Sequence, residues 1–341
     1  MTKVPADSVV SRRGFIVRGV TGAAALGGTS ALLAACGSSS GGGGKGGGKE
    51  IRIGYSAPFS ENSTSADIQR RVQAYGESLG YTMLIDHTTG GNVQNQLSTL
   101  NSWITQGVGA MSVLAPDPTA LRPVMEKAEA KGIAYTSVIF SVPGTNGGAL
   151  FDPADSGRQI GEAAVKWINE NDPTAEVLVH TFKLNPPIAA RWEIPTQMIK
   201  EQTRATIVAS QDANTQEDGF TVTQTALKAH PGISVVIGQS DDSALGAARA
   251  FRLAGKDPAK SWISGYDGTP EALNAISEGG AFKATAAVDH EVMAKAIVDL
   301  SAQLIKDGLP RDGHQVNKMV GTILVEHGDP RLPALLKANG G

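Results

Sequence analysis

Polar side chains follow two of the apolar segments of this sequence, at the points where strands are expected to end. Asp267 comes directly after the segment Trp262–Tyr266, and Ser240 follows the segment Ser234–Gly238. Carboxylate and hydroxyl oxygens at such positions can hydrogen-bond a ligand. Because ligands of open parallel sheets bind in the crevice at the carboxyl ends of the strands, these residues predict a polar binding site.

The residues after Asp267 also favour a structural role for its carboxylate. Thr269 is a good N-cap, Pro270 suits the first position of a helix, and Glu271 suits the first turn. Asp267 could therefore brace the turn before a helix instead of contacting a ligand, and the local sequence leaves both roles open.

Two aspartates follow Ser240, and one of them is expected to cap a helix that runs to Arg252. If Asp241 or Asp242 is the cap, Ser240 is free to face the crevice. Asp117 is expected in the same way to cap the helix that follows residues 110–115.

The motifs of several common catalytic and cofactor sites are missing. The sequence has no phosphate-binding Gly-x-x-x-x-Gly-Lys-Ser/Thr loop and no His-Glu-x-x-His metal motif. Gly107 and Gly109 precede an expected strand, whereas a dinucleotide-binding loop follows one. The six histidines show no metal-ligand spacing. We therefore predict a protein that is not an enzyme, with no catalytic residue, no cofactor and no metal.

The elements that must position the polar residues alternate along the chain. Short apolar runs and amphipathic segments follow one another from Ile51 onward, a pattern typical of parallel α/β layers. Phe220 and Leu227, seven residues apart, fall on one face of an expected helix. The expected strands are Ile51–Ser56, Thr82–Asp86, Ala110–Ala115, Ala134–Ile139, Glu176–Thr181, Thr206–Ser210, Ser234–Gly238 and Trp262–Tyr266. The expected helices include Ala66–Leu79, Val93–Gln106, Ala120–Lys131, Ser156–Asn169 and Gly219–Ala229.

These units occur in two sets, the first from Ile51 to Ile139 and the second from about Glu176. The segment Ser141–Asp152 between them is rich in proline and glycine, and we expect it to pass from one lobe to the other. The sequence therefore predicts an α/β fold with two doubly wound parallel-sheet lobes joined by a hinge. A ligand is expected in the crevice between the lobes.

The first 35 residues have the layout of an export signal. Basic side chains precede a short apolar stretch from Val20 to Ala35, which is diluted by glycine and alanine. A membrane-spanning helix needs about 20 strongly apolar residues, so this stretch is too short and too weak. The pair Arg12-Arg13, followed by Phe15, resembles a twin-arginine signal. The alternative is the ordinary basic region of a general secretory signal.

Cys36 is the only cysteine of the 341 residues, and the Leu-Ala-Ala before it resembles a lipobox. We expect residues 1–35 to be removed and Cys36 to be lipidated, so that the protein is exported and anchored to the outer face of the cell membrane. Residues 36–49 are mostly glycine and serine, and we expect them to form a flexible tether with a reach of roughly 19 Å.

The charge of the remaining chain argues against nucleic acid as a partner. Without residues 1–35 the chain carries 26 basic and 32 acidic side chains, a net charge of −6. No cysteine is left for a disulfide, so stability must come from core burial. About 290 residues after the tether are enough for two lobes.

The ordered set of motifs resembles the ribose-type sugar-binding proteins of ABC importers over nearly all of residues 51–325. The resemblance is carried by Val-Val-Ile-Gly-Gln-Ser-Asp-Asp-Ser-Ala-Leu-Gly at 235–246, Ala-Gly-Lys at 254–256 and Gly-Tyr-Asp-Gly-Thr-Pro at 265–270. In the N-terminal half, Leu-Gly-Tyr at 79–81 agrees with it. It implies a type I periplasmic binding protein fold, with 50–151 plus 289–317 as N-terminal lobe and 152–288 plus 318–341 as C-terminal lobe.

The resemblance also implies a function. Such a protein binds a sugar or sugar-like small molecule between its lobes and, as a monomer, delivers it to a membrane permease and its ATPase. The ligand would shift an open–closed equilibrium about a hinge at Ser141–Asp152, Val288–Asp289 and the approach to Val320. Repressors of the lactose type share the fold, but they carry a DNA-binding helix-turn-helix where this chain has an export signal.

Three residues match ligand-binding positions of that family. Asp267 matches a hinge-side aspartate, Arg191 the ligand arginine, and Asn62 a first-lobe asparagine. In the family, aromatic faces pack on the sugar ring and charged groups hydrogen-bond its hydroxyls. Phe59 could supply one such face, because Ser-Thr-Ser follows Asn62 where the family has Pro-Phe-Phe.

Other positions depart from the family. A first-lobe strand ends in Ile139-Phe140 where the family has Asp-Arg, which removes a hydroxyl clamp, and Phe140 could add a stacking face. Ser240 stands in place of an asparagine, Thr215 in place of a phenylalanine, and Asp289 follows the position of a hinge glutamine. We therefore expect a ligand other than ribose: a deoxy or modified sugar, a polyol or a non-sugar.

Two other functions stay open at this point. The first keeps the fold for a ligand sensor, or for a binder of a signalling molecule such as a furanosyl autoinducer. The second is a secreted glycoside hydrolase with Asp267 and Asp289 as its carboxylate pair.

Overall fold

The computed structural model describes residues 50–311 and 313–340. The expected signal, the expected lipidation site Cys36 and the expected tether at 36–49 lie outside the described residues. Within the described part of the chain, no helix is both long enough and apolar enough to cross a membrane.

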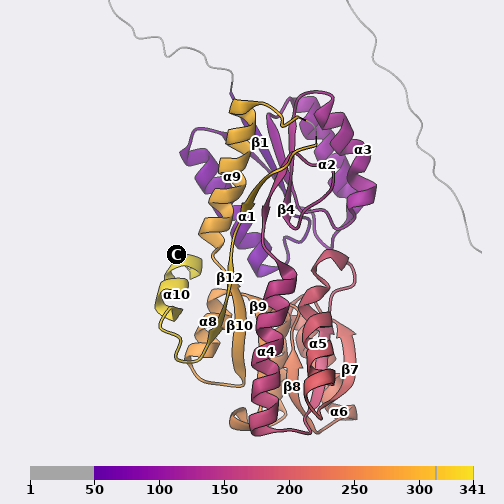
Figure 1. The fold of residues 1–341 in the computed structure, drawn as a ribbon, viewed down its shortest axis with the longest axis vertical. Helices are drawn as coiled ribbons and strands as arrows, with labels where there is room; N and C mark the ends of the chain where they lie inside the picture. Colours follow the sequence, from indigo (N-terminus) through magenta and orange to yellow (C-terminus); the bar gives the residue numbers. More distant parts are fainter. Residues whose placement is uncertain (1–49, 312, 341) are drawn as a thin grey trace, which may run out of the picture. The chain divides into compact units, whose positions relative to one another are not determined.

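The described chain forms two lobes, one above the other in Figure 1. The six-stranded sheet of the first lobe is parallel throughout, with the order β11-β5-β4-β3-β1-β2. Helices α1 and α9 pack against each other, as do α2 and α3. The elements of this lobe are β1 (Arg52–Ser56), α1 (Ser63–Ser78), β2 (Thr82–Asp86), α2 (Val93–Gln106), β3 (Ala110–Val113), α3 (Pro118–Glu129), β4 (Ala134–Ile139), β5 (Gly147–Leu150), α9 (His290–Asp307) and β11 (Val316–Met319).

The second sheet has the order β12-β10-β9-β8-β6-β7, and only β12 runs antiparallel to its neighbour among the described strands. Helix α4 packs on α5, and α6 on α7. The elements are α4 (Pro153–Asn171), β6 (Glu176–Thr181), the 3-10 turn Pro186–Ile188, α5 (Ala190–Gln202), β7 (Thr206–Asp212), α6 (Gln216–Ala229), β8 (Ile233–Ile237), α7 (Asp241–Leu253), the 3-10 turn Pro258–Lys260, β9 (Trp262–Asp267), α8 (Pro270–Ser277), β10 (Phe282–Val288), β12 (Thr322–Glu326) and α10 (Leu332–Gly340).

This architecture confirms the predicted fold class of two doubly wound lobes. The eight expected strands are all present, with ends within two residues of those expected, and the five expected helices agree within three residues. Asp117 and Thr269 are the expected N-caps, because each side chain accepts a hydrogen bond from the backbone N–H three residues later. Four further strands, β5, β10, β11 and β12, were not expected.

The chain passes between the two sheets three times: after β5, after β10 and after β11. The segment Ser141–Asp152 was expected to be the first passage, but most of it belongs to the first lobe, because β5 pairs with β4 and β11. The passage is therefore short and falls between Leu150 and Pro153. The boundary expected between residues 317 and 318 lies inside β11, whose four residues all pair with β5.

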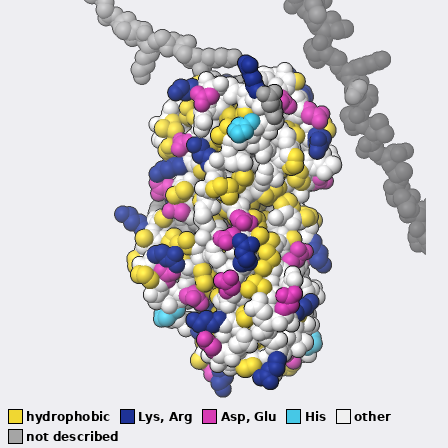
Figure 2. All heavy atoms as spheres, in the orientation of Figure 1, with side chains coloured by type: hydrophobic (Ala, Val, Ile, Leu, Met, Phe, Trp, Pro, Cys, Tyr) yellow, Lys and Arg dark blue, Asp and Glu magenta, His cyan; other side chains and the backbone are white. Residues whose placement is uncertain are grey.

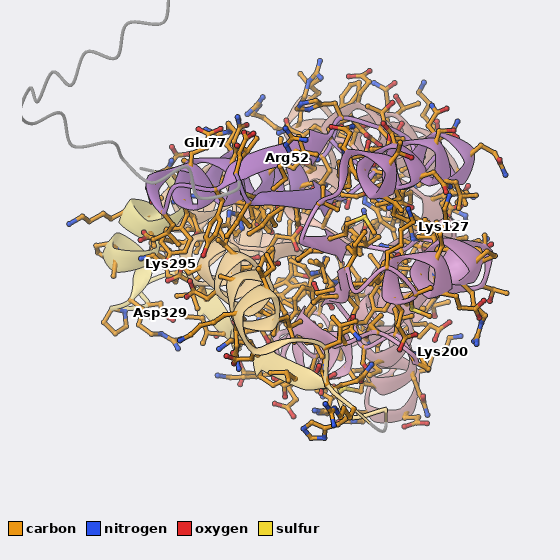
Figure 3. The ribbon with its side chains drawn as sticks, turned by 90° about the horizontal axis from the view of Figure 1, so that it is seen from above. Arg52, Glu77, Lys127, Lys200, Lys295 and Asp329 are labelled. Carbon is orange, nitrogen blue, oxygen red and sulfur yellow. The ribbon has the colours of Figure 1, made fainter. Side chains whose placement is uncertain are left out.

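The buried side chains form several clusters, and one of these extends through both lobes. One cluster of buried side chains includes Ile53 and Tyr55 of the first sheet and Trp262 and Tyr266 of the second. Most charged groups lie on the outside. Figure 2 shows basic and acidic side chains interspersed over the face drawn, and in Figure 3 Lys127, Lys200 and Lys295 lie toward the periphery. The buried charged groups described next are therefore unusual for this protein.

Candidate ligand-binding site

A cavity of about 60 Å³ lies where the carboxyl ends of strands from both sheets meet. Its lining residues follow or end β1, β3, β4, β6, β7, β8 and β9, which is where open α/β sheets bind ligands. Five of the seven expected ligand-binding residues lie here: Phe59, Asn62, Arg191, Ser240 and Asp267. The lining residues that were not expected are Thr64, Ser65, Leu114, Ile139, Phe182, Asn185, Ile188, Asn214 and Gln239.

Arg191 and Asp267 form a buried ion pair in the wall of this cavity. Nη2 of Arg191 donates to Oδ1 of Asp267 at 2.8 Å, and the two side chains are only 5% and 9% exposed. The guanidinium also lies 5.2 Å from the ring centroid of Phe151 and 4.9 Å from that of Tyr266. Aromatic faces stabilise a desolvated cation, so this environment fixes the arginine in place.

Three buried polar atoms of lining residues have no protein partner within the described part of the chain. They are Nε of Arg191, Oδ1 of Asn185 and Oγ1 of Thr64. An unsatisfied buried group costs about 1–3 kcal/mol. Together they offer a donor, an acceptor and a hydroxyl, and a ligand rich in hydroxyl groups can both donate and accept hydrogen bonds.

Two expected ligand residues already use their polar atoms within the protein. Oδ1 of Asn62 accepts from the backbone N–H of Ser65, and its Nδ2 donates to Asp242. The hydroxyl of Ser240 accepts from the backbone N–H of Ser243 and from Nε2 of Gln239. In these positions both residues shape the wall of the cavity, and their free hydrogen-bonding capacity is small.

The expectation that Asp241 or Asp242 caps the following helix is wrong. Ser240 is itself the N-cap of α7, and the two aspartates form the first turn of the helix, where both are buried. The sequence offered three adjacent residues with good capping side chains. Tertiary contacts of the aspartates decided among them.

Two aromatic rings meet at the cavity. The rings of Phe59 and Phe182 lie edge to face, with centroids 5.4 Å apart. In the family resemblance, Thr215 stands at the position of the second-lobe phenylalanine, and in the structure Thr215 caps α6. Phe182 could have been found from its place immediately after the expected strand Glu176–Thr181.

Phe140 does not line the cavity, contrary to expectation, and its neighbour Ile139 does. Phe140 instead packs, partly buried, against the core. Ile139 has φ +76° and Asp267 has φ +104°, and they are the two non-glycine residues with positive φ in the described part of the chain. Such strained backbone concentrates at functional sites, and here both residues line one cavity.

Asp289 also lies outside the cavity lining. Its carboxylate caps α9 by accepting from the backbone N–H of Val292 at 2.9 Å. The next residue, His290, is fully buried and contacts Oδ2 of Asp67 at 2.8 Å and the carbonyl of Asp267 at 3.1 Å. Asp267 and Asp289 therefore do not face each other across the cavity as a hydrolase pair.

A Gly-x-Ser-x-Gly sequence occurs at residues 76–80, and its position argues against a serine nucleophile. Ser78 ends α1, and its hydroxyl donates to the carbonyl of Tyr75. A nucleophile elbow lies instead at a turn from a strand into a helix.

Asp241 is a fully buried carboxylate beneath the site. It accepts hydrogen bonds from the backbone N–H of Thr269 at 2.7 Å and from the hydroxyl of Thr285 at 2.8 Å. Burial raises the pKa of Asp241 well above its usual range, and repulsion by Asp267 adds to this rise, whereas the two hydrogen bonds oppose it.

We expect Asp241→Asn to remove part of the pH dependence of stability. The pKa of Asp241 is raised in the folded state. Its contribution to the free energy of unfolding is therefore fully present below the unfolded pKa of about 3.9, and it is lost as the pH rises through the folded pKa. The amide can keep both hydrogen bonds, since the hydroxyl of Thr285 can also accept. Urea unfolding between about pH 4 and pH 8 should show the variant gaining stability relative to wild type as the pH rises. The exposed Asp307→Asn serves as control, and parallel curves for Asp241→Asn and wild type would contradict the expectation.

Asp242 connects the two lobes next to Asn62 of the cavity wall. Its Oδ2 accepts from the backbone N–H of Ser63 at 2.9 Å and from Nδ2 of Asn62 at 3.2 Å, and its Oδ1 accepts from the hydroxyl of Ser63 at 2.9 Å. Ser63 is the first residue of α1, so the carboxylate of one lobe lies at a helix N-terminus of the other. Burial raises the pKa of Asp242, and its hydrogen bonds with Ser63 oppose that rise.

Asp242→Ala is expected to weaken ligand binding about tenfold, although Asp242 does not line the cavity. The substitution removes three hydrogen bonds between the lobes, so it should weaken the affinity for a ligand that contacts both of them. Calorimetric titration measures the affinity, and small-angle scattering should show a more open ligand-free protein. The exposed Glu170→Ala is the matched control. An affinity equal to that of wild type would show that the contact does not bias closure.

Two parallel-sheet lobes, with a buried polar cavity between their strand ends, define a two-lobed α/β ligand-binding protein. Residues 53–309 match the family model of the periplasmic binding protein domain, and the chain belongs to this family. It is accordingly a binding protein and not an enzyme.

Relatives of known function cover most of the chain. A D-apiose import binding protein of Actinobacillus succinogenes is 26% identical over 255 residues, which is 73% of this chain and 80% of that protein. A ribose import binding protein of Bacillus subtilis is 24% identical over 258 residues, with coverages of 75% and 82%. An ABC transporter solute-binding protein of Bacillus halodurans with bound myo-inositol superposes with a TM-score of 0.74 at 19% identity, over 86% of this chain and 99% of that one.

Proposed function

We propose that this protein is the solute-binding component of an ABC importer and holds a sugar or a polyol between its two lobes. The relatives named above as import binding proteins for D-apiose and ribose support this role. The observation that carries the proposal is the composition of the cavity wall. It combines a desolvated Arg191–Asp267 pair, unpaired polar atoms of Asn185 and Thr64, and the rings of Phe59 and Phe182.

Each part of this wall has a counterpart in sugar chemistry. The hydroxyl groups of a sugar can accept from Nε of Arg191 and donate to Oδ1 of Asn185. The C–H face of a sugar ring packs well on the rings of Phe59 and Phe182. Asp267 orients Arg191 and offers its carboxylate to the ligand. Asn62 and Ser240 complete the wall, mainly by shape.

A thermal-shift panel of sugars, polyols and nucleosides tests this function. A ligand that binds only the folded protein stabilises it by about 2.7 kcal/mol at one hundred times its Kd. We expect a rise in Tm with at least one sugar or polyol and none with the nucleosides. Stabilisation by nucleosides alone would overturn the proposal.

We propose that binding closes the lobes about the three short passages between the sheets. The ligand contacts both lobes, so it binds the closed arrangement more tightly and shifts the equilibrium toward it. Small-angle scattering should show compaction when the stabilising ligand is added, and an unchanged profile at saturation would count against the clamp.

We further propose that export leaves the protein attached to the membrane through Cys36, within reach of a permease and its ATPase. A lipid on this residue would hold the folded body near the membrane by the residue 36–49 tether. In cell fractionation, Cys36→Ser is expected to move the protein from the membrane fraction to the soluble exported fraction. Retention of the variant in the membrane would contradict lipid anchoring at this residue.

A further inference from the structure

A second, smaller cavity of about 30 Å³ adjoins the ligand cavity on the side of the first sheet. The two cavities share the lining residues Thr64, Ser65, Leu114, Ile139 and Asp267. Beyond these, the smaller cavity is lined mainly by apolar or aromatic side chains: Tyr55, Ile68, Val138, Phe151, Val288 and Met293. We call this space the apolar subsite.

The apolar subsite is enclosed by side chains that are almost completely buried. Val138, Val288 and Met293 are between 1% and 3% exposed, and so is Leu114, which stands at the junction with the ligand cavity. A cavity of this volume has room for about two water-sized groups. Because most of its lining side chains are aliphatic or aromatic, the subsite is suited to an apolar substituent of the ligand.

Four of the residues that line the subsite carry polar side chains: Tyr55, Thr64, Ser65 and Asp267. Oγ1 of Thr64 is buried and has no partner within the described residues. Oδ1 of Asp267 is engaged by Arg191. Burial raises the pKa of the Tyr55 hydroxyl above its usual range. Ile139 presents an aliphatic side chain at the junction of the two cavities.

The two ends of the combined space thus differ in chemistry. The residues from the second lobe that line the ligand cavity are largely polar: Asn185, Arg191, Asn214, Gln239, Ser240 and Asp267. The first-lobe side leads into aliphatic and aromatic groups. A ligand that matches this division has hydroxyl groups along one side and an apolar group at the other.

We propose that the ligand is a sugar that carries a methyl group, of the 6-deoxyhexose class, and that this methyl group fills the apolar subsite. The inference rests on the proposed function and narrows its substrate class. A methyl group gains contact with Val138, Ile139 and Met293, whereas the hydroxyl of a hydroxymethyl group in the same place is desolvated among mostly aliphatic side chains. One such group in an apolar pocket is worth about tenfold or more in discrimination.

Calorimetric titration with matched pairs of sugars tests the proposal. The pairs are D-fucose and D-galactose, L-rhamnose and L-mannose, and 6-deoxy-D-glucose and D-glucose, which differ only in the terminal hydroxyl. We expect the deoxy member of at least one pair to bind about tenfold or more tightly than its parent. If sugars or polyols bind but no deoxy member is preferred, the subsite assignment is overturned and the proposed function stands. If no sugar or polyol binds, the proposed function itself fails.

Two variants separate the subsite from the rest of the cavity. Ile139→Asn places an amide at the junction, and asparagine tolerates the left-handed backbone of this position (φ +76°) better than isoleucine does. We expect this variant to lose the preference for the deoxy sugar. Met293→Leu keeps the subsite apolar and should keep the preference. A preference that survives Ile139→Asn in a folded protein would contradict the proposal.

A third variant tests the hydroxyl of Tyr55 as the alternative partner. Tyr55→Phe removes this group without changing the ring. In each pair, we expect the ratio of the affinity for the deoxy sugar to that for its parent to stay within about twofold of the wild-type ratio. The reason is that this substitution removes no hydrogen bond to the ligand. Specific loss of affinity for the parent sugar would show that Tyr55 binds the ligand hydroxyl, and would overturn the assignment of a methyl group.

Discussion

Arg191→Met is expected to abolish measurable ligand binding and to destabilise the protein by about 3–5 kcal/mol. The substitution removes the donors to Asp267 at 2.8 Å and to the carbonyl of Gln239 at 3.3 Å, together with the unpaired Nε of the cavity wall. It also leaves the carboxylate of Asp267 buried without a counter-charge, which is the larger part of the loss of stability. Urea unfolding measures stability, and titration with the stabilising sugar measures binding.

A double-mutant cycle with Asp267→Asn separates the two effects. If the unpaired carboxylate causes the loss of stability, the variant with both substitutions should be more stable than Arg191→Met alone. Binding should be absent in both, because the guanidinium donors are missing. Arg191→Lys retains the charge but not the planar fork, so it should recover stability more than affinity. Full affinity of Arg191→Met would exclude a direct role of this residue in the ligand site.

Phe182→Ala is the second change with a large expected effect. The ring packs edge to face against Phe59 at 5.4 Å and is 8% exposed, and loss of a buried phenylalanine costs about 3–5 kcal/mol of stability. We also expect the affinity for a sugar to fall at least about tenfold, because one of the two aromatic faces is lost. The two effects are measured by urea unfolding and by calorimetric titration.

Phe182→Leu and Phe140→Ala are the matched controls. Leucine keeps most of the buried apolar volume but no flat ring, so it should restore stability more than affinity. Phe140 lies outside the cavity lining, and Phe140→Ala should leave the affinity unchanged even if stability falls. Equal loss of affinity in Phe182→Ala and Phe140→Ala would show that the effect comes from general destabilisation.

Local sequence patterns were sufficient for the strands that carry most of the site. The runs at 176–181 and 262–266 are buried on both faces and flanked by turn residues, so composition alone indicates strands. The position of Asp267 at the end of such a strand then placed it at the edge where ligands bind. Arg191 is different, because it lies in a helix, and only the resemblance to a known family indicated it.

The strands that were not expected depend on partners far away in the sequence. Gly147–Leu150 has two glycines and no alternation, and it is a strand because β4 and β11 lie on either side. Val316–Met319 pairs with residues almost 170 positions earlier. A short segment of this kind gains its hydrogen bonds only when the rest of the sheet has formed, and its own sequence contains little signal.

The sequence by itself determined the fold class, the two repeated sets of strands and helices, and the edge of each sheet at which a ligand binds. These follow from periodicity and from turn residues, which act over a few neighbours along the chain. Only the tertiary structure decided which polar and aromatic groups meet there. Ile139, and not Phe140, lies in the cavity wall, and Phe182 packs against Phe59. Ser240 caps a helix, and Asp289 caps another helix outside the cavity lining. The physical reason is that side-chain direction at a strand end and competition among capping groups are set by packing between distant segments.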